Sequence, residues 1–100
     1  ENKWEYILRL YNQLIIIEYS SVIALNRTFA YGKVYGKEKA IVEAEKLGLQ
    51  DNRYYHELLG YLYTDINNQK AIAHYQKAIA LSKSANERAT LQKQIEQLVK

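Results

Sequence analysis

Apolar residues recur along this sequence at intervals of three and four, and almost nothing in the chain interrupts them. The 100 residues contain no Pro and only four Gly, so the residue types that most strongly end helices are scarce. A spacing of three and four places side chains on one face of an α-helix. Because no segment alternates apolar and polar residues over a strand's length, we expect an all-α fold.

Six apolar stripes follow one another along the chain. They begin at Trp4, Val22, Ala40, Tyr55, Ala71 and Leu91 and end at Ile15, Phe29, Leu47, Ile66, Ile79 and Leu98. Residues typical of helix ends lie between them: Ser20 or Ser21, Gly36, Gly48, Asp51 as a cap of the fourth helix, Asn67 or Asn68, and Ser84 with Glu87 as a capping box. Such short connections make consecutive helices antiparallel, so the sequence predicts about six antiparallel helices stacked as helical hairpins.

The composition excludes several classes of protein. Without Cys there is no disulfide, thiolate metal site or thiol catalysis, which fits a reducing cytoplasm. The longest apolar run, Leu14 to Ile17, is far shorter than the roughly 20 residues that span a bilayer. The net charge of +3 is small and spread along the chain, which favours an ordinary solvated surface. We expect one cytoplasmic domain over residues 1–100 and, because the chain begins at Glu1, a fragment of a longer protein.

Two of the expected helices share a pattern of small residues. Ala40, Ile41 and Ala44 recur 31 residues later as Ala71, Ile72 and Tyr75, followed by Ala78. An internal repeat of about this length, built of two helices, is typical of an α-solenoid. Small residues at the repeated positions allow paired helices to approach closely.

The segment around the second copy resembles the tetratricopeptide repeat. The matching residues are Leu59-Gly60 and Tyr63 on the first helix, then Ala71, Tyr75 and Ala78 on the second. His56 stands where the repeat usually has Trp, and the Pro that normally ends it is replaced near Lys83. The resemblance implies that Gly60, Ala71, Tyr75 and Ala78 set the register of two packed helices.

A second resemblance covers most of the chain. The segment Ser20-Ser21-Val22-Ile23-Ala24-Leu25-Asn26-Arg27 resembles one in the tetratricopeptide-like C-terminal extension of a group of extracytoplasmic-function (ECF) RNA polymerase sigma factors, with Ser21 where that group has Pro. Leu10 to Leu14, Val34 to Gly36 and Asn86 to Leu91 agree in order. The resemblance implies a non-catalytic regulatory domain that contacts the sigma regions of its own chain, core RNA polymerase or a regulatory protein. DNA would be contacted only through the sigma regions, which are absent here.

Asn26 and Arg27 form the most distinctive dipeptide of the chain. The periodicity places Asn26 on the apolar face, where a buried amide needs hydrogen bonds and would fix helix register. Arg27 then either reaches an acidic group within the domain or lies on a surface that recognises the partner.

No arrangement of residues indicates catalysis, a metal site or a bound cofactor. His56-Glu57 begins like a zinc motif, but Gly60 occupies the second ligand position and His74 lies on another helix, so we expect a solvated or core-edge histidine. The segment from Gly32 to Glu38 has the wrong spacing for a phosphate-binding loop. No Ser/His/Asp set or activated nucleophile is present in the sequence, and we expect that the protein is not an enzyme.

Two other functions remain open at this stage. A free-standing tetratricopeptide adaptor would hold a peptide in a groove near Tyr31, Tyr55 and Tyr63. A nucleic-acid-binding domain would use Lys33 and Lys37 with the interleaved tyrosines. Separately, the extra apolar residues Ile16 and Ile17 mark either a contact surface or part of the core. These sequence patterns leave Arg27, Tyr31, Tyr55 and Tyr63 as candidate partner-binding residues.

Overall fold

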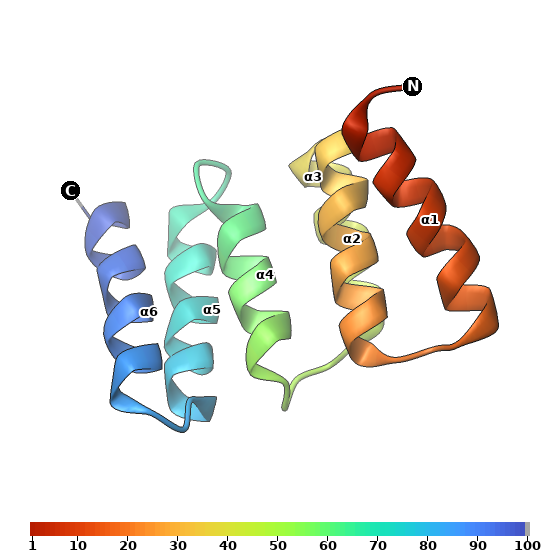
Figure 1. Cartoon of the computed structure of the whole chain (residues 1–100). Helices are drawn as coiled ribbons and strands as arrows, with labels where there is room; N and C mark the ends of the chain where they lie inside the picture. Colours follow the sequence, from red (N-terminus) through yellow and green to blue (C-terminus); the bar gives the residue numbers. More distant parts are fainter. Residues whose placement is uncertain (100) are drawn as a thin grey trace. The chain divides into compact units, whose positions relative to one another are not determined.

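The computed structural model of the protein describes residues 1–99 and contains six α-helices in this part of the chain (Figure 1). They are α1 (Lys3–Ile17), α2 (Ser21–Tyr35), α3 (Lys37–Leu47), α4 (Arg53–Tyr63), α5 (Asn68–Leu81) and α6 (Ala85–Leu98). None of residues 1–99 lies in a strand. The predicted all-α class and the number of helices are confirmed.

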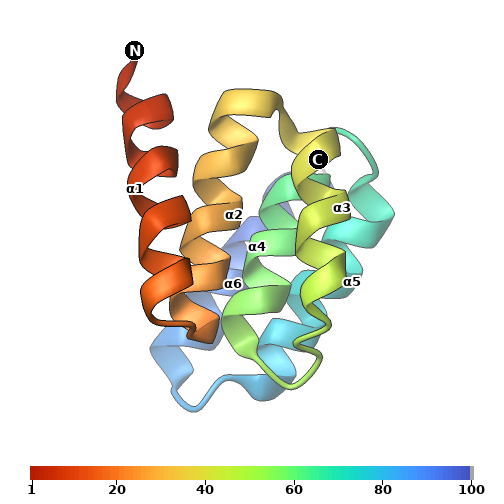
Figure 2. The same cartoon turned by 90° about the vertical axis from the view of Figure 1, so that its right-hand side faces the viewer.

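The chain divides into two compact units, Glu1–Gly48 and Leu49–Lys100. In the first unit α2 packs against both α1 and α3, and in the second α5 packs against both α4 and α6. Consecutive helices within each unit run antiparallel (Figures 1 and 2). Each unit is therefore a three-helix arrangement with its middle helix covered on two sides.

Most helix ends lie where the sequence predicts them. Ser20 caps α2, its hydroxyl oxygen accepting from the backbone N–H of Ile23 at 3.1 Å. Gly48 ends α3 in the left-handed conformation, with φ 61° and ψ 29°, which Gly adopts without a steric penalty. Ser84 caps α6 by accepting from the backbone N–H of Glu87 at 3.1 Å.

The predicted cap of α4 is wrong by one residue. Asp51 lies exposed in the turn, and Asn52 caps the helix instead. The side-chain oxygen of Asn52 accepts from the backbone N–H groups of Tyr54 at 2.9 Å and Tyr55 at 3.2 Å. Asn and Asp are about equally good caps. The sequence alone does not define a helix start to one residue, and α4 begins one residue later than Asp51 as a cap would require. Of the two candidates before α5, Asn67 is the cap.

Small residues bring α4 and α5 close together in the second unit. Gly60 on α4 is buried, and a Cβ added there would lie 2.8 Å from the ring of Tyr75 on α5. Ala71 and Ala78, on the same helix as Tyr75, have no exposed surface. The Tyr75 ring thus occupies the space that a larger residue at position 60 would take.

Tyr75 also belongs to the core that holds α6. Tyr75 and Ala78 gather with Leu91 and Ile95 into one buried cluster. In the first unit the interior is likewise rich in alanine, where α3 contributes Ala40 and Ala44, both without exposed surface. Ala40 and Ala71, the small residues that the sequence places 31 residues apart, are therefore both buried.

Substituting Gly60 tests the close approach of α4 and α5. We expect Gly60→Ala to lower the free energy of unfolding by about 1–3 kcal/mol, because the new methyl group overlaps the Tyr75 ring. In Gly60→Ala/Tyr75→Leu the loss should be smaller than the sum of the two single losses. Urea unfolding of the four proteins measures this. Additive losses would contradict the steric explanation.

Candidate interaction surfaces

Arg27 links the first two helices. Its Nε donates to the side-chain oxygen of Asn12 on α1 at 2.6 Å, and its guanidinium carbon lies 5.9 Å from the centre of the Tyr31 ring. The partner of Arg27 within the domain was predicted to be acidic, but it is the side-chain amide of Asn12. Arg27 and Tyr31 are both half-buried, so each retains some surface for a partner.

Asn26 does not lie in the core. The predicted burial of its amide is wrong, because this side chain is exposed on α2, on the side that also exposes Val22. The buried polar residue of α2 is Thr28, whose hydroxyl donates to the backbone oxygen of Ala24 at 2.9 Å. A Thr hydroxyl satisfied within its own helix needs no partner on another one. A role for Asn26 in fixing helix register by a buried hydrogen bond is therefore excluded.

Two of the predicted partner-binding tyrosines are buried. Tyr55 is 2% exposed and Tyr63 is 7% exposed, so these two side chains offer almost no surface to a peptide. Both rings pack beside histidines, Tyr55 edge-on to His56 at 5.1 Å and Tyr63 stacked on His74 at 5.8 Å between centroids. The sequence shows the helical face of these residues, but not whether that face is covered.

His56 is a core residue, which corrects the predicted solvated or core-edge position. Its side chain is 1% exposed, with Nε2 2.8 Å from the backbone oxygen of Gln50 and Nδ1 3.0 Å from Nδ1 of His74. Since a carbonyl oxygen only accepts, Nε2 of His56 carries a proton. Among residues 1–99, no cluster of three or more His, Cys, Asp or Glu residues is placed to hold a metal ion.

Basic and aromatic side chains meet in the first unit. The Trp4 and Phe29 rings lie edge to face at 5.6 Å, and the ammonium of Lys33 lies 5.6 Å and 5.3 Å from their centres. Lys3 lies 5.3 Å from the Trp4 ring and Lys39 lies 6.0 Å from the Tyr35 ring. The cation–aromatic pattern seen in the sequence is thus used, at least in part, within the unit itself.

A row of exposed apolar residues lies on α1 in the first unit. Tyr6, Leu10, Leu14 and Ile17 are 48%, 43%, 39% and 82% exposed, and their spacing places them in one line, here called the α1 stripe. Ile16, Tyr19 and Val22 are also exposed, at 84%, 65% and 63%. Ile16 and Ile17 are therefore surface residues. The opposite face of α1 packs on the unit through buried Leu8, with Trp4, Ile7, Tyr11 and Ile15 partly buried.

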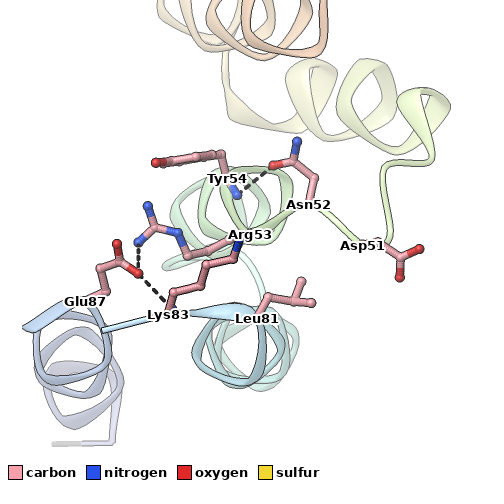
Figure 3. Close-up of a pocket in the computed structure, with 7 residues that line it drawn as sticks. All are labelled: Asp51, Asn52, Arg53, Tyr54, Leu81, Lys83 and Glu87. Carbon is pink, nitrogen blue, oxygen red and sulfur yellow. Dashed lines mark hydrogen bonds and ion pairs between the residues drawn. The ribbon is translucent and has the colours of Figure 1, made fainter. Parts of the chain in front are cut away.

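A polar pocket of about 320 Å³ lies in the second unit, between the start of α4 and the turn from α5 to α6 (Figure 3). Its lining residues are Asp51, Asn52, Arg53, Tyr54, Leu81, Lys83 and Glu87. Figure 3 shows Arg53 and Glu87 directed toward each other across the space between α4 and α6. The lining carries two cations and two carboxylates, so it has no preferred sign of charge.

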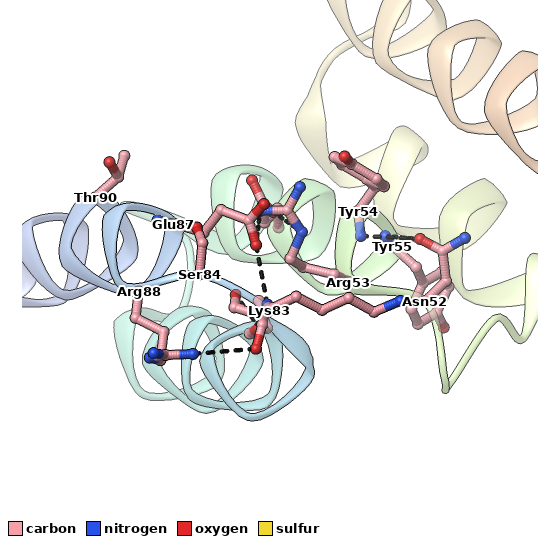
Figure 4. Close-up of polar contacts among 12 residues, drawn as sticks. Asn52, Arg53, Tyr54, Tyr55, Lys83, Ser84, Glu87, Arg88 and Thr90 are labelled. Carbon is pink, nitrogen blue, oxygen red and sulfur yellow. Dashed lines mark hydrogen bonds and ion pairs between the residues drawn. The ribbon is translucent and has the colours of Figure 1, made fainter.

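Arg53 is the centre of this arrangement. Its Nη1 lies 3.3 Å from Oε1 of Glu87 on α6, its Nε lies 3.3 Å from Oε2 of Glu57 on α4, and its guanidinium lies 4.3 Å from the centre of the Tyr54 ring. Oε1 of Glu87 also accepts from the backbone N–H of Lys83 at 3.1 Å (Figure 4). The Glu87 carboxylate thus joins the capping of α6 to an ion pair with α4.

Glu57 is the strained member of the network. Burial of its carboxyl raises the pKa above the ordinary value, while the nearby Arg53 guanidinium lowers it and Glu87 raises it. Nε of Arg53 lies within ion-pair distance of Oε2 of Glu57, but the two atoms do not form a hydrogen bond. Oε2 of Glu57 is therefore buried and accepts no hydrogen bond. The i, i+4 spacing of Arg53 and Glu57 is visible in the sequence, but the contact of Arg53 with Glu87 on α6 is not.

Comparisons with known proteins give one relative and no family. No family model matches the chain, and no solved structure matches it. The chain is 36% identical over 101 residues to an uncharacterized protein of Rhizobium meliloti (strain 1021). The alignment covers 98% of this chain but only 24% of the relative, so the chain spans about a quarter of the relative's length. No helix within residues 1–99 is both long and apolar enough to cross a membrane.

The raised pKa of Glu57 predicts a pH dependence of stability. Between the unfolded carboxyl pKa of about 4.3 and the higher folded value, the folded state binds more protons than the unfolded state. The free energy of unfolding therefore falls as pH rises through this window. We expect Glu57→Gln to remove this fall and Arg53→Met to steepen it. Urea unfolding at a series of pH values measures the slopes, and an unchanged slope in Glu57→Gln would contradict the assignment.

The Asn12–Arg27 bond predicts an energetic coupling between α1 and α2. Because the bond is exposed to water, we expect a coupling at the low end of the range for such bonds, about 0.5 kcal/mol. A double-mutant cycle of Asn12→Ala and Arg27→Ala, followed by urea unfolding, measures it. Gln13→Ala, the exposed neighbour on α1, is the matched control and should show no coupling to Arg27→Ala.

Proposed function

We propose that the chain is a non-catalytic protein-interaction domain from the C-terminal region of an ECF-type RNA polymerase sigma factor, and that it modulates transcription initiation. The observation that carries this proposal is the α1 stripe. An exposed, continuous apolar surface on a small domain is typical of a contact with another protein surface. The tetratricopeptide-like stacking of the helices and a cytoplasmic location belong to the same proposal.

Residues that carry the resemblance to the sigma-factor extension support it. Asn12 lies in the matching segment from Leu10 to Leu14, and Arg27 ends the matching segment that begins at Ser20. The two side chains form the 2.6 Å hydrogen bond between α1 and α2. Two segments that match the extension in sequence therefore contact one another in the first unit, which is what a shared helical arrangement requires.

The length of the relative also fits. Because the chain spans about a quarter of the Rhizobium meliloti protein, that protein has space for further domains beside the matching segment. The two sigma regions, which bind the promoter and the polymerase in ECF factors, would be among them. In this proposal the present chain contacts DNA only through those regions.

Regulation follows from docking of the α1 stripe. Its partner is the sigma regions of the same polypeptide, core RNA polymerase or a regulatory protein. Binding that differs between the active and inactive states by a few kcal/mol is enough to shift their populations. A helix of 15 residues with four aligned apolar side chains is a surface of suitable size for such a modest contact.

A test in the full-length protein separates docking from folding. We expect Leu10→Glu/Leu14→Glu to change transcription from the protein's own promoter by several-fold, because charges on the α1 stripe oppose burial against a partner. Both residues are about 40% exposed, so the substitutions leave the core in place. Run-off transcription with core polymerase measures the effect.

The matched control adds the same charges elsewhere. Gln94→Glu/Gln97→Glu places two carboxylates on the exposed surface of α6 and should leave transcription unchanged. Circular dichroism confirms equal helix content in the variants. Equal transcription by the α1 variant, the control and the natural protein would overturn the proposed function.

A further inference from the structure

The α1 stripe and the outer surface of α6 differ in character. On α6 the exposed residues include Gln92, Lys93, Gln94, Glu96 and Gln97, all of them polar. Water covers such a surface without penalty. On α1 the exposed line consists of Tyr6, Leu10, Leu14 and Ile17. The first and last helices of the chain therefore suit different surroundings, and α1 suits an apolar one.

Charges stand at both ends of the α1 stripe. Lys3 lies three residues before Tyr6, its ammonium 5.3 Å from the Trp4 ring at the edge of the stripe, and Glu18 directly follows Ile17. Both side chains are exposed. Fifteen residues of α-helix span about 22 Å, so Lys3 and Glu18 of one chain cannot reach each other. The stripe thus has a positive end, an apolar middle and a negative end.

A surface with this order is complementary to itself when two copies lie antiparallel. We propose that the α1 stripe is covered by the α1 stripe of a second copy, related by a twofold axis that passes near Leu10. In this register Leu10 meets its own counterpart, Tyr6 lies against Leu14 of the partner subunit, and Lys3 lies beside Glu18 of the partner subunit. The symmetry forms the Lys3–Glu18 pair twice.

The antiparallel direction has a second electrostatic advantage. The positive N-terminal end of each α1 lies beside the negative C-terminal end of the other, so the helix dipoles attract. A parallel arrangement would place Lys3 beside Lys3 and Glu18 beside Glu18. The charges therefore select one orientation of the pair, while the apolar side chains supply most of the attraction.

The expected dimer is weak. Standard protein interfaces bury about 800 Å² on each partner, and a single helix about 22 Å long offers less. We expect dissociation on dilution, with a dissociation constant on the order of micromolar. This inference rests on the proposed function only because both assign the α1 stripe to protein docking. Self-association then competes with the other partners for this surface.

Sedimentation of the purified chain over a range of concentrations tests the proposal. We expect a concentration-dependent shift from monomer to dimer mass, and loss of the dimer in Leu10→Glu/Leu14→Glu. The control Gln94→Glu/Gln97→Glu on α6 should dimerise like the natural chain. A chain that remains monomeric at millimolar concentration, or an α1 variant that still dimerises, would overturn the proposal.

Charge reversal tests the orientation. Lys3→Glu and Glu18→Lys should each weaken the dimer about five- to tenfold, since each reversal creates two repulsive pairs. The double variant Lys3→Glu/Glu18→Lys should restore it, because the pairs form again with opposite sign. Failure of the double variant to recover would exclude this register.

The two proposals fail separately. A monomeric chain whose α1 variant still alters transcription overturns the dimer and leaves the proposed function in place. If the chain dimerises but the α1 variant does not alter transcription, the dimer stands and the proposed function is overturned.

Discussion

The second unit depends on the close approach of α4 and α5 at Gly60. The Tyr75 ring lies where a side chain at position 60 would be, and the alanines at 71 and 78 remove bulk from the same helix. Tyr75 and Ala78 of α5 also form a buried cluster with Leu91 and Ile95 of α6. One aromatic ring therefore belongs to both helix contacts of the unit, and close packing leaves little freedom at either.

Polar contacts also connect the helices of the second unit. Arg53 reaches from α4 to the Glu87 carboxylate on α6, and that carboxylate also accepts a backbone bond just before the same helix. The second ion-pair partner of Arg53 is Glu57, whose partly buried position disfavours the charge of its carboxylate. Such a network links helix starts that lie far apart in the sequence, at the expense of one poorly satisfied carboxylate.

The first unit differs from the second in how its outer helix is covered. α1 contributes one fully buried side chain, Leu8, and exposes the four residues of the α1 stripe. A helix that is apolar on two sides is satisfied only when both are covered. The core of the unit covers one of them, and the proposals assign the other to protein contact. Function in this view lies on a helix surface and needs no pocket or reacting group.

The sequence by itself determined the helices and most of their ends, because periodicity and capping are local properties that a few neighbouring residues specify. It also placed the small residues of α3 and α5 correctly. Whether a given side of a helix is covered depends on residues distant in the chain, and here the sequence failed: Asn26 is exposed, while Tyr55, Tyr63 and His56 are buried. The Arg53 network and the exposure of the α1 stripe could not be predicted either, because both depend on contacts between residues distant in the chain. Only the tertiary structure decides which apolar residues remain outside, because burial is a property of the packed helices and not of any one of them.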